Sequence, residues 1–152
     1  MNLDDLDYFK QLDTLNMIGE IDHLPEQLAS AYELGLQHDL PDWEGIRQVV
    51  IAGMGGSAIG ADLLASYCAP LAPIPVYVHR DYGLPFFARG AETLVVCSSH
   101  SGNTEETLDA FDTASKAGCP VIAVTTGGEL AKRARENNIP VWTFEHAGQP
   151  RA

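Results

Sequence analysis

Long apolar runs, cysteines and basic residues are all scarce in this sequence, and each shortage excludes a class of protein. No run approaches the ~20 apolar residues that cross a bilayer, so we expect no membrane span. The N-terminus is acidic, whereas a secretory signal begins with basic and then apolar residues. The three cysteines form no CxxC pair, and two of them stand in apolar runs as small core residues do. We therefore predict a cytoplasmic protein from a reducing compartment.

The shortage of basic residues also argues against a nucleic-acid partner. The net charge is -12, and residues 1–44 carry most of it. These residues include eleven Asp or Glu and one Lys, whereas the remainder includes ten Asp or Glu and eight Lys or Arg. The N-terminal segment is thus strongly acidic, and the rest of the chain is nearly neutral. No basic stripe exists that would neutralise the phosphates of DNA or RNA.

Motifs that hold metals or nucleoside triphosphates are missing as well. The histidines His23, His38 and His79 are scattered and have no metal-ligand spacing. The pattern G-x-x-x-x-G-K-[ST], whose backbone cradles the phosphates of ATP or GTP, does not occur. We therefore predict neither a metal nor a cofactor.

The acidic N-terminal segment has the apolar spacing of helices. Its pattern breaks near Asp13 and Thr14, and Pro25 suits the first turn of a further helix. The apolar residues that recur every three positions are Leu3, Leu6, Phe9, Leu12, Leu15 and Ile18. We interpret residues 1–44 as a helical arm packed on one domain, residues 45–152.

From residue 46 onward, short apolar runs alternate with helical patterns. Each run is continuous, as in strands that are buried on both faces of a parallel sheet. The five predicted strands are 49–52, 74–78, 94–97, 120–124 and 140–144. This alternation predicts an α/β fold with a doubly wound five-stranded parallel sheet and right-handed crossovers. In the flavodoxin-like order 2-1-3-4-5, the turns after the first and third strands would meet at a ligand site beyond the carboxyl ends of the strands.

Residues 98–104, which we call the hydroxyl loop, separate the third predicted strand from the next helix. The loop contains Ser99, Ser101 and Thr104. A helix N-terminus presents free N–H groups and the positive end of a dipole, so hydroxyls in front of it make a site for an anion such as phosphate. One helix cap needs only one such side chain, and the surplus favours a ligand site. The two acidic residues that follow, Glu105 and Glu106, are predicted to complement the helix dipole.

Residues 53–60, which we call the glycine turn, follow the first predicted strand. Gly53 and Gly55 match a weak form, G-x-G-x-x-A, of the dinucleotide fingerprint, and Ser57 stands where the next helix begins. The acidic residue of that fingerprint would be Asp81, which stands farther from Gly53 than the usual about 20 residues. A dinucleotide would bind the glycine turn and leave the hydroxyl loop without a role. A sugar phosphate held between the glycine turn and the hydroxyl loop would use both. We favour the sugar phosphate and keep a nicotinamide-dependent oxidoreductase domain as an alternative.

Together the two segments resemble the sugar isomerase (SIS) domain. Gly53-Met54-Gly55-Gly56-Ser57-Ala58-Ile59-Gly60 followed by Ser99-His100-Ser101-Gly102-Asn103-Thr104-Glu105-Glu106-Thr107 looks like the N-terminal half of the bifunctional phosphoglucose/phosphomannose isomerases. The resemblance covers nearly the whole chain, with His100 where the family usually has Tyr. It implies that Arg151 stabilises the enediolate of an aldose–ketose isomerisation. The residues that it implies for binding the phosphate of a hexose are Gly55, Gly56, Ser57, Ser99, Ser101 and Thr104.

The resemblance also shows what has no match in this chain. Full-length members carry a second SIS domain, which supplies a glutamate base, a histidine from across a homodimer and a lysine for ring opening. None of these has a matching position in the 152 residues. We therefore expect the full-length protein to interconvert glucose 6-phosphate or mannose 6-phosphate with fructose 6-phosphate, and this chain alone to be inactive. A non-catalytic SIS sensor of sugar phosphates is the second alternative.

Overall fold

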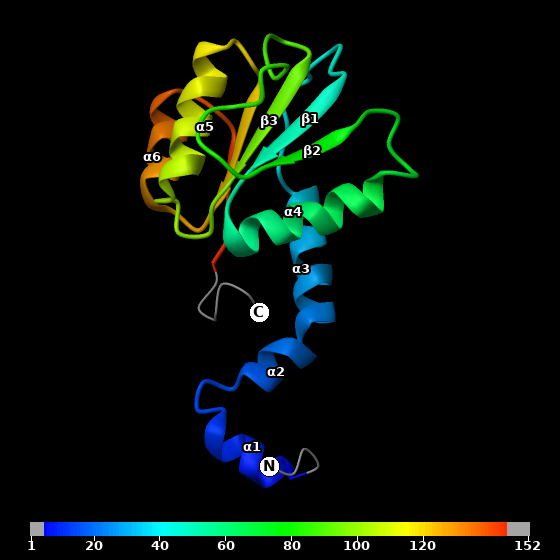
Figure 1. The fold of residues 1–152 in the computed structure, drawn as a ribbon, viewed down its shortest axis with the longest axis vertical. Helices are drawn as coiled ribbons and strands as arrows, with labels where there is room; N and C mark the ends of the chain where they lie inside the picture. The colour runs from blue at the N-terminus through cyan, green and yellow to red at the C-terminus, as the bar shows by residue number, and fades with distance from the viewer. Residues whose placement is uncertain (1–4, 146–152) are drawn as a thin grey trace. The chain divides into compact units, whose positions relative to one another are not determined.

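The centre of the fold is a five-stranded sheet in which all neighbouring strands are parallel (Figure 1). The structure is a computed structural model, and it describes residues 5–145. The strands are β1 (Gln48–Ala52), β2 (Val76–His79), β3 (Thr93–Ser98), β4 (Val121–Thr125) and β5 (Val141–Thr143). Their order across the sheet is β2-β1-β3-β4-β5, so the predicted order 2-1-3-4-5 is confirmed.

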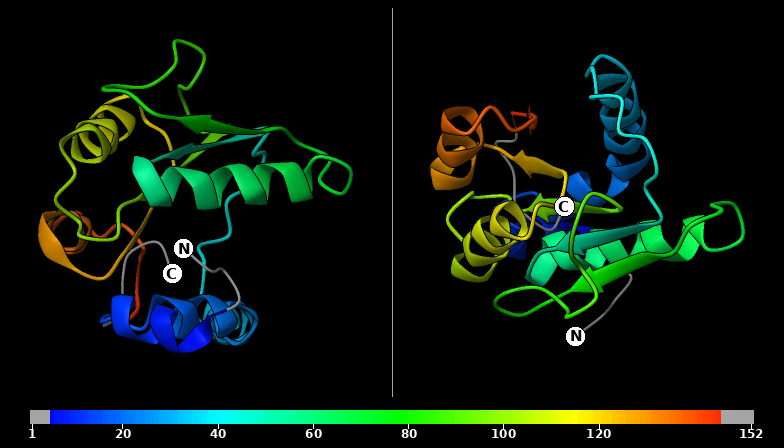
Figure 2. Two further views of the ribbon diagram at one scale, coloured as in Figure 1. Left: turned by 60° about the horizontal axis from the view of Figure 1, so that its bottom comes forward. Right: turned by 90° about the horizontal axis from the view of Figure 1, so that it is seen from above.

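Three helices cover this sheet. They are α4 (Gly55–Cys68), α5 (Glu105–Lys116) and α6 (Gly128–Glu136). Helix α4 packs along β1 and β2, whereas α5 and α6 lie side by side, with α6 against β4 and β5 (Figure 2). The β1-to-β2 connection crosses the sheet in the opposite direction to those after β3 and β4. Right-handed crossovers therefore put α4 on one face of the sheet and α5 and α6 on the other.

Small side chains let the helices pack closely on the sheet. Each helix turns two buried alanines inward: Ala58 and Ala61 of α4, Ala110 and Ala114 of α5, and Ala131 and Ala134 of α6. The largest buried side chains, Phe111 and Leu130, fill the space between α5, α6 and the strands. Cys97 belongs to the same cluster, and burial raises the pKa of its thiol, as expected of a cysteine that serves as a core residue.

The register of the sheet aligns the ends of three strands. Ala52 at the end of β1 pairs with Cys97 of β3, and Ser98 of β3 pairs with Val124 of β4. The turns that follow β1, β3 and β4 therefore begin at one edge of the sheet. Ligands of doubly wound sheets bind beyond this carboxyl edge, where the strand order reverses.

The N-terminal segment is helical, as its apolar spacing predicts. It contains α1 (Leu6–Leu12), α2 (Met17–Asp22) and α3 (Leu24–Leu36). The predicted break near Asp13 is confirmed. Helix α1 ends with Asp13 as its C-cap residue. The Asp13 carboxylate accepts hydrogen bonds from the N–H groups of Met17 (2.7 Å) and Ile18 (2.8 Å), which caps the start of α2. Pro25 lies in the first turn of α3, where its missing N–H is not needed.

Backbone contacts divide the described residues into two units, 5–39 and 40–145. Helices α1, α2 and α3 contain no buried residue, so the hydrophobic core belongs to the second unit. Within residues 5–145, no helix combines the length and the apolar character needed to cross a bilayer. The division of the whole chain into an arm, 1–44, and a domain, 45–152, stays a prediction.

Candidate functional site

The glycine turn and the hydroxyl loop meet at the carboxyl edge of the sheet. The N–H of His100 donates a hydrogen bond to Ser57 Oγ over 3.3 Å, which joins the loop after β3 to the first turn of α4. Gly53 makes this approach possible, because a Cβ at that position would stand 2.8 Å from the carbonyl oxygen of Ser98. The structure thus brings together the two segments that the sequence predicts to share one site.

Two helices begin at this meeting point without a side-chain cap. Helices α4 and α5 follow Met54 and Thr104, and neither residue caps its helix through its side chain. The first N–H groups bonded within the helices belong to Ala58 and Leu108, so the N–H groups before them lack a helical partner. Two sets of such donors, each at the positive end of a helix dipole, are a favourable environment for an anion.

The third helix at this edge, α6, is capped by the hydroxyl loop itself. In its first turn, the N–H of Glu129 donates to Asn103 Oδ1 (3.1 Å), and the N–H of Leu130 donates to the carbonyl oxygen of Gly102 (2.9 Å). The start of α6 therefore serves to hold the loop, and the candidate anion site belongs to α4 and α5.

The serines of the hydroxyl loop differ in exposure. Ser99 is only 2% exposed, and its Oγ accepts a hydrogen bond from the N–H of Gly102 (3.1 Å) and lies 2.9 Å from Thr104 Oγ1. Ser99 therefore braces the loop from within, whereas Ser101 is exposed and Thr104 half-buried. The predicted phosphate-binding residues all lie in the first turn of α4 or in this loop. Their contact with a phosphate stays a prediction.

Two hydroxyl groups are left with a proton to donate. Ser57 Oγ accepts from the N–H of His100, and Ser101 Oγ accepts from the N–H of Asn103 over 3.2 Å. A hydroxyl that accepts a backbone hydrogen bond still carries its own hydrogen, which needs an acceptor. A phosphate oxygen is such an acceptor, so the hydrogen bonds of the free site already suit an anion.

Carboxylates line the α5 side of this edge. The hydroxyl of Tyr82 donates to Glu105 Oε2 (2.9 Å), and the N–H of Gly83 donates to Asp109 Oδ2 (2.6 Å). The hydrogen bond to the carboxylate raises the pKa of Tyr82. These bonds fasten the connection after β2 to α5. Glu105 and Glu106 both lie in the first turn of α5, where they complement the helix dipole as predicted.

Asp81, the acidic residue that the dinucleotide fingerprint would use, and the preceding Arg80 both make local contacts. The carboxylate of Asp81 accepts a hydrogen bond from the N–H of Tyr82 (2.8 Å). The guanidinium of Arg80 pairs with Asp62 of α4 and donates to the carbonyl oxygen of Ala58 (3.3 Å). Local structure thus accounts for both residues, which weakens the argument for a nicotinamide site.

The turn after β4 has no role predicted from the sequence, yet it supports the hydroxyl loop. Thr126 donates both its N–H (3.0 Å) and its hydroxyl (2.7 Å) to the carbonyl oxygen of His100. Gly128 approaches so closely that a Cβ there would overlap the carbonyl oxygen of Ser101. The signal in the sequence is a pair of threonines and a pair of glycines after an apolar run. Assigning it requires the knowledge that β4 neighbours β3.

One residue predicted to act in catalysis, Arg151, lies outside the described residues.

The ring of His100, which the sequence marks as a departure from the family, contacts Phe144 edge-on with 6.1 Å between ring centroids. Over residues 5–145, no group of three or more His, Cys, Asp or Glu side chains is placed to hold a metal ion.

Solved structures with this fold include phosphosugar isomerases. A protein of Bacillus subtilis described as a phosphosugar isomerase matches with a TM-score of 0.56 and 28% identity, over 68% of this chain and 32% of its own. The sugar isomerase domain of the RpiR transcription factor of Sphaerobacter thermophilus shares the fold, with a TM-score of 0.56 and 21% identity over 83% and 78% of the two chains. No family model matches the sequence. The two solved structures show that the chain has the fold of the sugar isomerase (SIS) domains.

Sequence similarity points to one group of proteins with this fold. The bifunctional phosphoglucose/phosphomannose isomerase of Caldicellulosiruptor bescii is 45% identical over 137 residues, which make up 90% of this chain and 40% of that protein. The chain is homologous to part of the bifunctional phosphoglucose/phosphomannose isomerases, as the resemblance predicts. It spans well under half the length of this relative.

Proposed function

We propose that this chain is the sugar-phosphate-binding domain of a cytoplasmic aldose–ketose isomerase, which converts glucose 6-phosphate or mannose 6-phosphate into fructose 6-phosphate. The observation that carries the proposal is the meeting of two uncapped helix starts, those of α4 and α5, beside a loop of hydroxyl groups. The name of the Caldicellulosiruptor bescii relative, an isomerase of both sugars, supports the choice of substrates.

In this proposal the phosphate is held by N–H and hydroxyl donors. The N–H groups of Gly55, Gly56 and Ser57 come from the first turn of α4, and the hydroxyls of Ser101 and Thr104 stand before α5. A phosphate in this place gains from both helix dipoles as well as from these donors. Binding of this kind suits a domain whose net charge is close to zero.

The isomerisation itself needs further groups. The reaction moves a proton between C1 and C2 through an enediolate, and this transfer requires a general base. We assign the stabilisation of the enediolate to Arg151, and the base to the part of the relatives that this chain does not span. The working enzyme in this proposal is a homodimer of two-domain chains.

Sugar phosphates are expected to raise the melting temperature of the chain. A ligand that binds only the folded state stabilises it, by about 2.7 kcal/mol at a hundred times its dissociation constant. The measurement is a thermal-shift titration with fructose 6-phosphate, glucose 6-phosphate and inorganic phosphate, with NAD and NADP as comparators. A shift with the dinucleotides and none with millimolar sugar phosphates would contradict the proposal and favour the oxidoreductase alternative.

Removal of one loop hydroxyl is expected to weaken phosphate binding while the fold survives. Ser101→Ala and Thr104→Ala should each cost about 1.5–3 kcal/mol of binding, the range for hydrogen bonds to a charged group. Ser66→Ala, which removes an exposed hydroxyl farther along α4, is the matched control and should leave the affinity unchanged. Equal affinities for the unmodified chain and the Ser101→Ala/Thr104→Ala double variant would mean that these hydroxyls only shape the loop.

A further inference from the structure

We propose that Asn103 is a positioning residue of the phosphate site, which ties the hydroxyl loop to α6 and so holds Ser101 in place before a ligand arrives. This inference rests on the proposed function, because it concerns how the same site is kept ready. The hydroxyl chemistry of the site does not by itself require Asn103.

Asn103 makes three hydrogen bonds, one that joins the hydroxyl loop to α6 and two with Ser101. Its Oδ1 accepts from the N–H of Glu129 (3.1 Å), and its Nδ2 donates to the carbonyl oxygen of Ser101 (3.1 Å). Its backbone N–H donates to Ser101 Oγ (3.2 Å). One residue therefore contacts both the carbonyl and the hydroxyl of Ser101, and links them to a helix 26 positions further along the chain. The amide oxygen and one of the two amide N–H groups are thus engaged within the protein, so we assign Asn103 a role that acts through Ser101.

The backbones on either side of this link are packed together. The N–H of Leu130 donates to the carbonyl oxygen of Gly102 (2.9 Å). Gly102 has a φ of 69°, and a Cβ there would overlap the carbonyl oxygen of Gly127. The hydroxyl loop thus lies directly against the start of α6, and a change in the position of α6 would be transmitted to Ser101.

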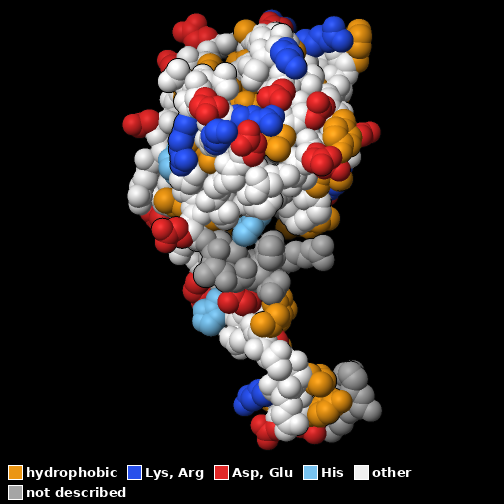
Figure 3. Space-filling view, turned by 90° about the vertical axis from the view of Figure 1, so that its left-hand side faces the viewer, with side chains coloured by type: hydrophobic (Ala, Val, Ile, Leu, Met, Phe, Trp, Pro, Cys, Tyr) orange, Lys and Arg blue, Asp and Glu red, His pale blue; other side chains and the backbone are white. Residues whose placement is uncertain are grey.

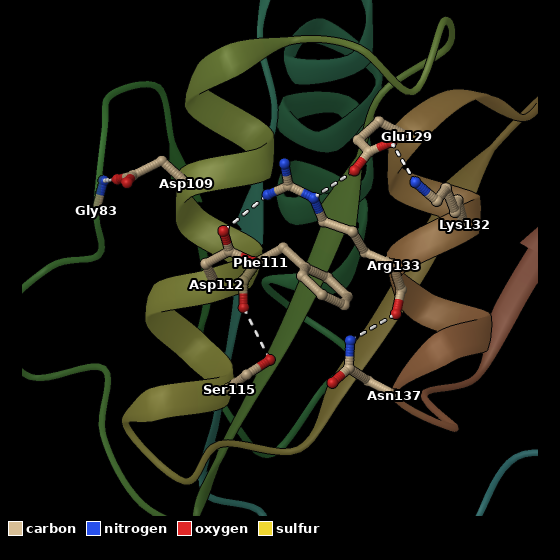
Figure 4. A network of polar contacts seen from close by, with 9 residues as sticks. All are labelled: Gly83, Asp109, Phe111, Asp112, Ser115, Glu129, Lys132, Arg133 and Asn137. Atoms are coloured by element: carbon tan, nitrogen blue, oxygen red, sulfur yellow. Dashed lines mark hydrogen bonds and ion pairs between the residues drawn. The ribbon is translucent and has the colours of Figure 1, made fainter.

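Helix α6 is itself fixed to α5 by an arginine. Acidic and basic side chains are intermixed on this face of the molecule (Figure 3). In close view, Arg133 reaches from α6 to Asp112 of α5 (2.7 Å) and to Glu129 (3.0 Å), and Lys132 lies 3.7 Å from Glu129 (Figure 4). The hydrogen bond from Arg133 lowers the pKa of the Glu129 carboxyl. Glu129 is therefore held twice, at its carboxylate by Arg133 and at its N–H by Asn103.

These contacts form one continuous support, from α5 through Arg133 and Glu129 to Asn103 and Ser101. A loop that is already in its binding conformation loses less entropy when the ligand binds. Without the Asn103 amide, the loop keeps its hydroxyls but is no longer fixed to α6. The affinity for phosphate should then fall although no ligand contact has been removed.

The test compares two asparagines of the same network. Asn103→Ala removes the link, whereas Asn137→Ala removes a hydrogen bond to the carbonyl oxygen of Arg133 (2.8 Å) at the opposite end of α6 (Figure 4). Dissociation constants for inorganic phosphate and fructose 6-phosphate would be measured by NMR titration of the ¹⁵N-labelled chain. We expect Asn103→Ala to weaken both about tenfold, as expected for the loss of hydrogen bonds that orient the loop, and Asn137→Ala to change neither by more than about twofold.

A double-variant cycle separates positioning from general loosening of the fold. If Asn103 acts through Ser101, the Ser101→Ala/Asn103→Ala pair binds phosphate about as weakly as Ser101→Ala alone. Additive losses, or an unchanged affinity in Asn103→Ala, would overturn the inference. Should Asn103→Ala not fold, as its spectrum would show, Asn103→Ser takes its place in the same cycle. Absence of phosphate binding by the unmodified chain would instead overturn the proposed function.

Discussion

In a coupled assay that starts from fructose 6-phosphate, the 152-residue chain is expected to show no turnover above background. Two carboxylates beside the hydroxyl loop already have partners, because Glu105 accepts a hydrogen bond from Tyr82 and Glu129 is paired with Arg133. General-base help is typically worth about 10²–10⁴-fold. The loss of substrate positioning by the remainder of the enzyme adds to this effect, since well-oriented groups supply up to about 7–11 kcal/mol.

The positive control for this assay is the whole Caldicellulosiruptor bescii relative, of which the chain spans 40%. Its turnover under the same conditions shows that the coupling enzymes and the substrate are sound. Turnover by the 152-residue chain near the ~10 s⁻¹ that is usual for enzymes would refute the two-domain proposal. Glu105, Glu106 and His100 would then become candidates for the catalytic base.

The substitution Gly102→Ala is expected to destabilise the fold by about 2–5 kcal/mol and to abolish phosphate binding. Gly102 has a φ of 69°, which costs a residue with a side chain about 1–2 kcal/mol. The new methyl group would also overlap the carbonyl oxygen of Gly127 and stand 2.8 Å from Thr125 Oγ1. Overpacking of this kind costs about 1–3 kcal/mol more, and it would push the hydroxyl loop away from α6.

The matched control is Gly118→Ala. Gly118 has nearly the same φ, 71°, but a Cβ there would meet nothing within 4 Å. The free energy of unfolding of this variant should therefore fall only by the cost of the left-handed conformation, about 1–2 kcal/mol. Its affinity for phosphate should be unchanged. Urea unfolding gives the two free energies of unfolding. Equal losses in the two variants would show that the contact between the loop and α6 yields easily and does not shape the site.

The sheet can be predicted from the sequence because each strand is a continuous apolar run between turns. The run 94–97 coincides with β3, Thr93–Ser98, and the other strands are shifted only slightly at their ends. The strand order can be predicted as well, because the glycine turn and the hydroxyl loop share a ligand only if β1 lies beside β3. The hydrogen bond between His100 and Ser57 shows the expected meeting.

The division of labour among the loop hydroxyls cannot be predicted in this way. Ser99 and Ser101 are the same residue type two positions apart, yet one is buried and the other exposed. The turn over residues 99–102 distinguishes them, because it brings the N–H of Gly102 back to the carbonyl oxygen and Oγ of Ser99. The link from Asn103 to Glu129 is equally hidden, since it depends on where α6 begins relative to the hydroxyl loop.

The end of α4 shows a limit of another kind. The apolar pattern predicts a helix through Leu63 and Leu64, and α4 continues to Cys68. Its apolar residues do not mark one buried face, because Leu63 and Tyr67 are largely exposed while the buried positions are alanines. The apolar periodicity of a helix is therefore a weak signal where small residues make its contact with the sheet.

The uncapped starts of α4 and α5 limit how far this domain can be stabilised without harm to the phosphate site that we propose. At position 54, where Met54 stands, Asp or Ser would cap α4 and add about 1 kcal/mol of stability. The same carboxylate or hydroxyl would occupy the donors that we assign to phosphate. The best residue for folding and the best residue for binding therefore differ at this position, as is common where activity and stability compete. Efforts to raise the thermal stability of this domain should leave Met54 and Thr104 unchanged and act on the far ends of the helices.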